Sequence, residues 1–213
     1  MIEICELTKR YGNKTVLDHI SVVFQPGKIY GLVGTNGCGK TTLMRCICGF
    51  SLPSAGSVTV YGKKINKDCD FAPNTGIIIE TPGFLPKYSA KRNLAILAGT
   101  SGKASKERIA EVIRQVGLDP HEKKPVGKYS LGMRQRLGIA QAIMEDPSVL
   151  ILDEPFNGLD KEGQNDIHVL LQKQKELGKI ILLASHSALD ISKACDVVFE
   201  MMDGHLVEKK DDA

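Results

Sequence analysis

A glycine-rich segment that ends in lysine and threonine is the strongest chemical signal in the sequence. It runs Gly34-Thr35-Asn36-Gly37-Cys38-Gly39-Lys40-Thr41 and continues with Thr42. Glycines let a backbone wrap around a phosphate chain with its N–H groups pointing inward, and a helix that starts here adds positive potential. We expect Lys40 to hold the β- and γ-phosphates as a catalytic residue and Thr41 to bind Mg²⁺. Residues 34–42 are therefore the predicted binding site of a nucleoside triphosphate.

Two adjacent carboxylates follow a short apolar run later in the chain. The run covers residues 149–152, and Asp153 and Glu154 come directly after it. Ligands of parallel sheets bind at the carboxyl ends of the strands, so this pair is expected beside the phosphates. Successive side chains on a strand diverge, which predicts different tasks for the two. We expect Asp153 to serve the Mg²⁺ shell and Glu154 to activate the attacking water as a general base.

A third segment separates this chain from GTPases, kinases and other phosphate-loop proteins. It runs Tyr129-Ser130-Leu131-Gly132-Met133-Arg134-Gln135-Arg136. The segment opens a predicted helix and resembles the signature motif of ABC ATPases, usually Leu-Ser-Gly-Gly-Gln, with Ser130 and Gly132 matching in place. A serine hydroxyl and backbone N–H groups at a helix start can bind a γ-phosphate. Tyr129, Leu131 and Met133 depart from the motif.

The resemblance to ABC ATPases extends over nearly the whole chain and implies further site residues. It implies that Tyr11 stacks on adenine, where a turn tyrosine is the alternative, and that His186 contacts the γ-phosphate as a switch residue. It also implies that Asp160, which closes Asn157-Gly158-Leu159-Asp160, belongs to a loop that crosses a dimer interface at the nucleotide.

Glu80 stands where most members of that family carry a glutamine. A glutamate can still bind Mg²⁺ through an oxygen, but it adds negative charge near the phosphates. Together with the altered signature segment, this substitution resembles the branch of bacterial exporters that handle bacitracin and lantibiotic peptides. Residues 80–88 are the predicted lever that acts on a membrane partner, and changing Phe84 is predicted to uncouple transport from ATP hydrolysis.

The segments around these motifs predict an α/β fold. Residues 29–33, 149–152 and 180–184 are apolar throughout, as parallel strands covered by helices must be. Residues 84–144 change to helical spacing, with Ser105 as a helix cap. Alternation of apolar residues near the N-terminus predicts antiparallel strands that contain Ile2, Ile4, Ile20, Val22 and Phe24.

We therefore expect a single ABC ATPase domain over residues 1–213. Its P-loop NTPase core, with a mostly parallel sheet and an N-terminal antiparallel β part, comprises residues 1–83 and 145–213. An inserted α-helical subdomain with the signature segment comprises residues 84–144. A helix is predicted over 161–177, a closing hairpin over 197–207 and a polar tail over 208–213.

Composition excludes several other classes of protein. The formal net charge of +3 gives no electrostatic reason to expect nucleic acid as a partner. The six cysteines form no Cys-x-x-Cys motif and do not have the spacing of zinc ligands, so we expect them to be reduced. No secretory signal is apparent, and the apolar runs are far shorter than the roughly 20 residues that span a bilayer. We expect a cytoplasmic protein that is peripheral on the membrane and acts there through a partner.

The family resemblance implies a head-to-tail dimer with ATP between the two subunits, beneath a transmembrane permease subunit. The second ATP-binding subunit is an identical or a related chain. One rival is a non-transport ABC ATPase that acts on ribosomes or nucleic acid, but such proteins typically carry two cassettes or a long coiled-coil insert. Another is a module that binds ATP without hydrolysing it, which Glu154 argues against. The transported cargo and the direction of transport stay open.

Overall fold

A six-stranded sheet forms the centre of the molecule. The computed structural model describes residues 1–80 and 82–209. The strand order is β10-β9-β3-β8-β7-β6. The strands from β9 to β6 run parallel, and β10 pairs antiparallel with β9 at one edge. Their bounds are Lys28–Val33 for β3, Thr75–Ile78 for β6, Val149–Asp153 for β7, Ile180–Ala184 for β8, Val197–Met202 for β9 and His205–Lys209 for β10.

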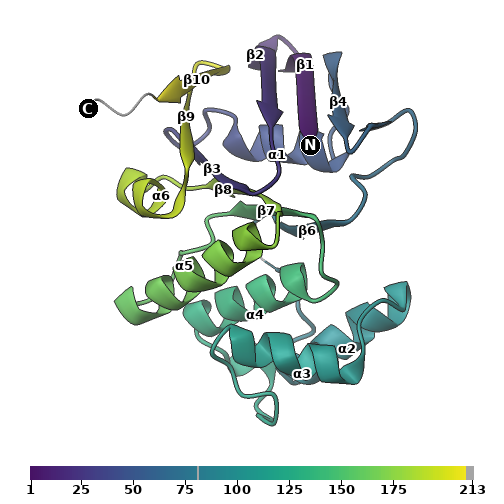
Figure 1. Ribbon diagram of the computed structural model, residues 1–213, viewed down its shortest axis with the longest axis vertical. Coiled ribbons are helices and arrows are strands. Elements are labelled where there is room, and N and C mark those ends of the chain that lie inside the picture. The colour runs from purple at the N-terminus through teal and green to yellow at the C-terminus, as the bar shows by residue number, and fades with distance from the viewer. Residues whose placement is uncertain (81, 210–213) are drawn as a thin grey trace.

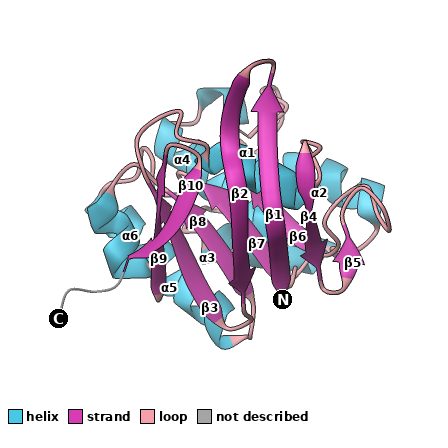
Figure 2. Ribbon diagram, turned by 90° about the horizontal axis from the view of Figure 1, so that it is seen from above, coloured by secondary structure: helices cyan, strands magenta, loops and turns pink. Residues whose placement is uncertain are grey.

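A smaller antiparallel sheet lies above the first, as Figures 1 and 2 show. Its order is β2-β1-β4-β5. The strands are β1 (Ile2–Tyr11), β2 (Lys14–Phe24), β4 (Ala55–Val60) and β5 (Lys63–Lys64). The alternation of buried and exposed residues along β1 follows the apolar pattern of the sequence, so the predicted antiparallel strands are confirmed.

Helix α1 (Lys40–Cys48) lies between the two sheets. One apolar core joins the inner faces of β1 and β2 to α1 and to one face of the large sheet, where Ile151 and Leu182 point. A second core covers the other face, where Leu150 and Leu183 meet the remaining helices. Strands apolar on both sides are what this layered arrangement requires, because each side contacts a helix layer.

The remaining helices lie on the far side of the large sheet (Figure 1). They are α2 (Ala90–Ser101), α3 (Lys106–Gln115), α4 (Leu131–Ile143), α5 (Lys161–Glu176) and α6 (Ala188–Ala194), with a 3₁₀ turn at Val126–Lys128. Ser105 caps α3 by accepting a hydrogen bond from Arg108 N, as predicted. Helices α2, α3 and α4 occupy the end of the molecule opposite β1 and β2, and the division at residues 84 and 144 stays a prediction.

Strand β6 and helix α6 are among the elements that were not expected from the sequence. Strand β6 is only four residues long and contains Gly76, which breaks the strand pattern. A Cβ at this position would lie 1.9 Å from the carbonyl oxygen of Ala142, so the close packing of β6 on α4 requires the glycine. Helix α6 spans seven residues, too few for a clear helical period.

Three further predictions concern the cysteines, membrane-spanning helices and the C-terminal tail. All six cysteines are unpaired. Within residues 1–80 and 82–209, none of the helices is both long enough and apolar enough to span a bilayer. The last four residues of the predicted polar tail, 210–213, lie outside the described residues.

Candidate functional site

The phosphate loop connects the end of β3 to the start of α1. Its backbone takes conformations that only glycine adopts freely, with φ of 152° at Gly34 and 120° at Gly39. A Cβ on Gly34 would lie 2.4 Å from the carbonyl oxygen of Met201, and one on Gly39 would lie 2.9 Å from that of Val16. The loop is thus pressed between β9 and the start of β2, which fixes its shape. Thr35, Asn36 and Gly37 form its exposed rim, and Cys38 is half-buried beneath them.

Lys40 folds back into the loop that precedes it. Its Nζ donates to the carbonyl oxygens of Gly34, at 2.7 Å, and Thr35, at 3.1 Å, and lies 3.8 Å from Cys38 Sγ. The residue is only 6% exposed. The first turn of α1 has no acidic residue, so the ammonium and the helix N-terminus together make the loop interior strongly positive. This arrangement is suited to bind an anion.

Thr41 and Asp153 meet in the folded chain although 112 residues separate them. Thr41 Oγ1 donates to Asp153 Oδ2 across 2.7 Å. Burial raises the pKa of Asp153, and the nearby charges of Glu154 and Glu80 act in the same direction. The hydrogen bond from Thr41 and the charge of Lys40 partly oppose that rise in the pKa. A cation at this point would stabilise the ionised carboxylate.

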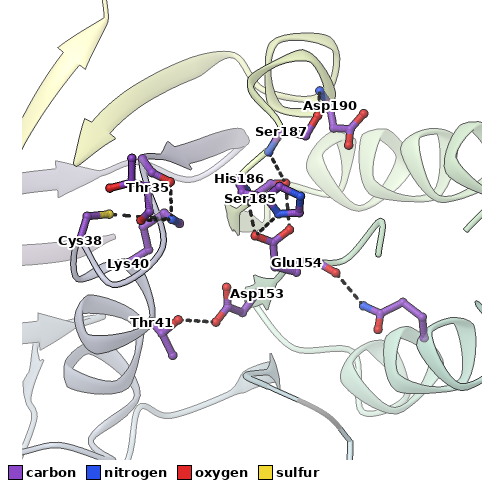
Figure 3. A network of polar contacts seen from close by, with 12 residues as sticks. Thr35, Cys38, Lys40, Thr41, Asp153, Glu154, Ser185, His186, Ser187 and Asp190 are labelled. Atoms are coloured by element: carbon purple, nitrogen blue, oxygen red, sulfur yellow. Dashed lines mark hydrogen bonds and ion pairs between the residues drawn. The ribbon is translucent and has the colours of Figure 1, made fainter. Parts of the chain in front are cut away.

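Glu154 is held at the end of the neighbouring strand β8 (Figure 3). Its backbone has φ of 50° and its N–H donates to the carbonyl oxygen of Ala184. The carboxylate accepts hydrogen bonds from Ser185 Oγ, at 3.0 Å, and from the backbone N–H of His186, at 2.8 Å. His186 Nδ1 lies 3.0 Å from the same carboxylate, a distance at which a proton on Nδ1 can be donated to it.

Asp153 and Glu154 therefore diverge as expected, one toward Thr41 and the other toward His186 (Figure 3). The predicted phosphate loop, the two carboxylates and His186 gather at the carboxyl ends of β3, β7 and β8. Ser185 and Gln135 were not predicted as site residues. Gln135 is 8% exposed and donates from Nε2 to the carbonyl oxygen of Glu154. For Ser185, the available signal was the buried apolar strand that ends one residue earlier, at Ala184.

Ser130 and Gly132 lie at the start of α4. Ser130 Oγ accepts a hydrogen bond from Met133 N, so the serine is a helix cap. A Cβ on Gly132 would lie 2.6 Å from the carbonyl oxygen of Gly158. Within the described residues, no hydrogen bond joins Ser130 or Gly132 to the phosphate loop of the same chain. Gly132 and Leu131 of the signature segment pack against Gly158 instead.

Asp160 caps α5, and Tyr11 closes the β1–β2 hairpin. Asp160 Oδ1 accepts a hydrogen bond from Gly163 N at 2.9 Å. The hydroxyl oxygen of Tyr11 lies 3.3 Å from Ser51 Oγ, and Lys9 Nζ lies 4.7 Å from the ring centroid. Tyr11 is 51% exposed, so about half of its surface is accessible to a ligand. The same hairpin reaches the phosphate loop through Val16.

Glu80 follows strand β6 and is paired with an arginine that was not predicted as a site residue. Glu80 Oε1 lies 2.5 Å from Nη2 of Arg45, which is on α1. The sequence contained a signal for this arginine, because it stands four residues after Thr41 and so shares a face of the helix with it. The excess negative charge expected at Glu80 is therefore balanced within the structure.

Known proteins resemble this chain in sequence over most of its length. The family model described as "ABC transporter" matches residues 17–157. The ABC transporter ATP-binding protein YybJ of Bacillus subtilis is 45% identical over 97% of this chain and 94% of its own length. The bacitracin transport ATP-binding protein BcrA of Enterococcus faecalis is 43% identical over 98% of this chain and 68% of its own. The lantibiotic transport ATP-binding protein SrtF of Streptococcus pyogenes is 34% identical over 99% and 91%.

Solved structures share the fold. The ATP-binding subunit of an ABC transporter superposes with a TM-score of 0.89 and 25% sequence identity, covering 100% of this chain and 90% of that one. A bacterial ABC transporter cassette solved as a dimer also reaches 0.89, at 22% identity, covering 99% and 98%. The P-loop α/β fold expected from the sequence is confirmed. The chain belongs to the ABC transporter family, as an ATP-binding protein of the ABC ATPase type.

Proposed function

We propose that this chain is the ATP-hydrolysing subunit of an exporter of antimicrobial peptides or drugs, working beneath a separate transmembrane permease. The observation that carries the ATPase part is the arrangement of Glu154 beside Lys40 and the Thr41–Asp153 pair at one edge of the sheet. The peptide cargo is supported by the similarity to bacitracin and lantibiotic transport proteins.

Residues 34–42 bind the triphosphate of ATP in this proposal. Lys40 exchanges its bonds with loop carbonyls for bonds to the β- and γ-phosphates. The Thr41 hydroxyl and the Asp153 carboxylate fit Mg²⁺, because they are oxygen ligands that already lie side by side. No group of three or more His, Cys, Asp or Glu side chains among the described residues could hold a metal alone, so phosphate oxygens and water complete the shell. The bound ion would neutralise charge that develops on the phosphates.

Glu154 acts as the general base toward the attacking water. Ser185 and the backbone of His186 direct its carboxylate, so the side chain keeps one orientation. The His186 ring lies against the same carboxylate and is 65% exposed, which leaves its other nitrogen free to meet the γ-phosphate. Tyr11 binds adenine through its exposed ring face.

Ser130, Gly132 and Asp160 serve the nucleotide of a second subunit. Their position away from their own phosphate loop is consistent with a head-to-tail dimer in which each site is completed by the partner. ATP closes such a dimer and hydrolysis opens it, because the nucleotide has a higher affinity for the closed state. The second subunit is an identical or a related ATP-binding chain.

A groove of about 560 Å³ beside β6 is where we place the permease. It is lined by β6, by Pro82 and Gly83, and by residues of α2 and α4, with Phe50 at its rim. Phe84 packs partly buried against the core beneath the helices. Residues 80–88 therefore connect the sheet edge at the phosphate site to the groove, as a lever requires, and the chain works peripherally on the cytoplasmic face of the membrane.

The ATPase proposal is tested by Mg²⁺-dependent hydrolysis and by light scattering in ATP. Glu154→Gln should lower the rate at least about 100-fold and accumulate as a dimer, because it keeps ATP but loses the base. Glu162→Gln, an exposed change on α5, is the matched control. Activity retained in Glu154→Gln, or a wild type that neither hydrolyses ATP nor dimerises, contradicts the proposal. Co-purification with ribosomes or nucleic acid instead of an integral membrane protein would favour the non-transport alternative.

The lever is tested with Phe84→Ala in cells that carry the permease. Transport should fall about tenfold while the ATPase activity of the purified subunit stays within about twofold, because coupling energies between distant sites are of this size. Leu177→Ala, at an exposed position after α5, is the control. Equal loss of transport and hydrolysis would count against a coupling role for this segment.

A further inference from the structure

Arg45 and Glu80 form an ion pair between two elements that border the phosphate site. Strand β6 is in register with β7, with Ile78 opposite Leu152, so Glu80 and Glu154 each stand two residues beyond aligned positions. Glu80 therefore emerges at the same sheet edge as the two carboxylates of the site, one strand away from them. Arg45 reaches it from α1, one helical turn after Thr41.

The Arg45–Glu80 ion pair holds charge at a fixed position and contributes little to the stability of the fold. The side chains of Arg45 and Glu80 are 41% and 63% exposed, and exposed pairs contribute little to folding. Glu80 has φ of 64°, a left-handed conformation that is unfavourable for a residue with a Cβ. This backbone turn and the guanidinium together keep the carboxylate at Arg45.

The charge of Glu80 acts on the metal-binding side of the site. Glu80 emerges one strand away from Asp153, whose hydroxyl partner is Thr41. An unpaired glutamate here would repel a bound triphosphate, whereas the guanidinium returns the local charge to neutral. The neutral glutamine that most ABC ATPases carry would need no such arginine.

We propose that Arg45 is a positioning residue for Glu80 and the counter-charge that makes a glutamate compatible with a bound triphosphate at this junction. The inference rests on the proposed function, since it takes residues 34–42 as the ATP site. It predicts that nucleotide affinity follows the net charge of the pair. Glu80→Gln should bind ATP most tightly, wild type and Arg45→Met/Glu80→Gln equally, and Arg45→Met most weakly.

The first test is the binding of a fluorescent ATP analogue in EDTA, which removes the metal from the measurement. We expect about three- to tenfold between neighbouring members of the series, and smaller differences in about 1 M salt, where screening shortens electrostatic range to about 3 Å. Arg45→Lys, which keeps the charge, should stay near wild type. Arg114→Met, which removes an exposed arginine at the end of α3, is the matched control.

The second test asks whether Arg45 positions the carboxylate. Mn²⁺ is titrated into each ATP-bound variant and followed by electron paramagnetic resonance. Arg45→Met should bind Mn²⁺ about threefold or more tightly than wild type, because the freed Glu80 can turn to the ion. The double variant should lose this gain, since a neutral amide is a weaker ligand than a carboxylate.

The outcomes separate this inference from the proposed function. If wild type binds and hydrolyses ATP but all four proteins of the series bind the analogue alike, Arg45 is not a counter-charge and the ATPase proposal stands. If Mn²⁺ affinity does not change in Arg45→Met, the positioning of Glu80 by Arg45 is refuted. A wild type that binds no ATP analogue overturns both the inference and the function on which it rests.

Discussion

The ammonium of Lys179 lies at the opposite end of β8 from Ser185 and is almost completely buried. Its Nζ donates to Asp146 Oδ1 at 2.6 Å and to Gln174 Oε1 at 2.7 Å. Lys179 is 5% exposed and Gln174 is 6% exposed, but the Asp146 side chain is 72% exposed. The change Lys179→Met keeps the length and apolar stem of the side chain and removes only its charge and donors.

The expected loss of unfolding free energy depends on which interactions Asp146 and Gln174 keep when the ammonium is removed. Asp146 stays in water when the ammonium is removed, so no buried charge is left uncompensated. Gln174 loses the donor to its buried Oε1, which predicts a loss of about 1–3 kcal/mol of unfolding free energy. Asp146→Asn tolerates the left-handed φ of 51° and still accepts a hydrogen bond, so it should cost only about 1 kcal/mol.

The two changes should not add, because Asp146 stabilises the fold mainly through Lys179. Urea unfolding of the single and double variants measures this, and the double variant should match Lys179→Met within about 0.5 kcal/mol. Full additivity, or a loss below about 0.5 kcal/mol for Lys179→Met, would refute the reasoning. ATPase activity of folded Lys179→Met should stay at the wild-type level, since the phosphate site lies at the other end of the sheet.

The same contact predicts a pH dependence of stability. The hydrogen bond from Lys179 lowers the pKa of Asp146 in the folded protein. A lowered folded pKa means that the contribution is complete above the unfolded value of about 3.9 and is lost as pH falls through the folded pKa. Wild type should therefore lose stability relative to Asp146→Asn as the medium is acidified through this range. A difference that is constant from neutral to acid pH would contradict this assignment.

Two further predictions concern the site. Gly132→Ala should lower ATPase activity at least about tenfold, because its Cβ meets the Gly158 carbonyl, whereas Gly99→Ala in α2, with nothing within 4 Å, should keep full activity. Normal hydrolysis in Gly132→Ala would show that this contact is dispensable. Ser185→Ala should lower kcat about three- to tenfold with little change in KM, because Glu154 loses one of its hydrogen bonds; an unchanged kcat would show that this bond does not orient the carboxylate.

Much of the fold was accessible from the sequence because its signals are local. The apolar runs at 149–152 and 180–184 fix buried parallel strands, and a buried strand delivers the residues that follow it to one edge. The phosphate loop carries its own geometry in its glycines. By contrast, β6 and α6 are too short to show a period, and the packing of Gly76 against Ala142 is visible only in three dimensions.

The polar partners of the site were less accessible. Ser185 and Gln135 hold Glu154 through contacts that link 31 and 19 positions of sequence, and no pattern of residue types announces such pairs. Arg45 balances Glu80 across 35 positions, so the sequence showed an excess carboxylate that the folded chain neutralises. Residue types and spacing thus indicated the candidate site. The residues that orient and balance its charged groups could be identified only from tertiary contacts.

Residues 154–160 have a consequence for communication between catalytic centres. At one end Glu154 is bound by Gln135 of α4, and at the other Gly158 is packed under Gly132 of the same helix. Helix α4 therefore contacts both Glu154 and Gly158, and it begins with the signature segment that, in the proposed dimer, touches the other nucleotide. In the proposed dimer, a shift of Glu154 during hydrolysis would be transmitted through α4 to the signature segment at the opposite ATP, so hydrolysis at one site would affect the other.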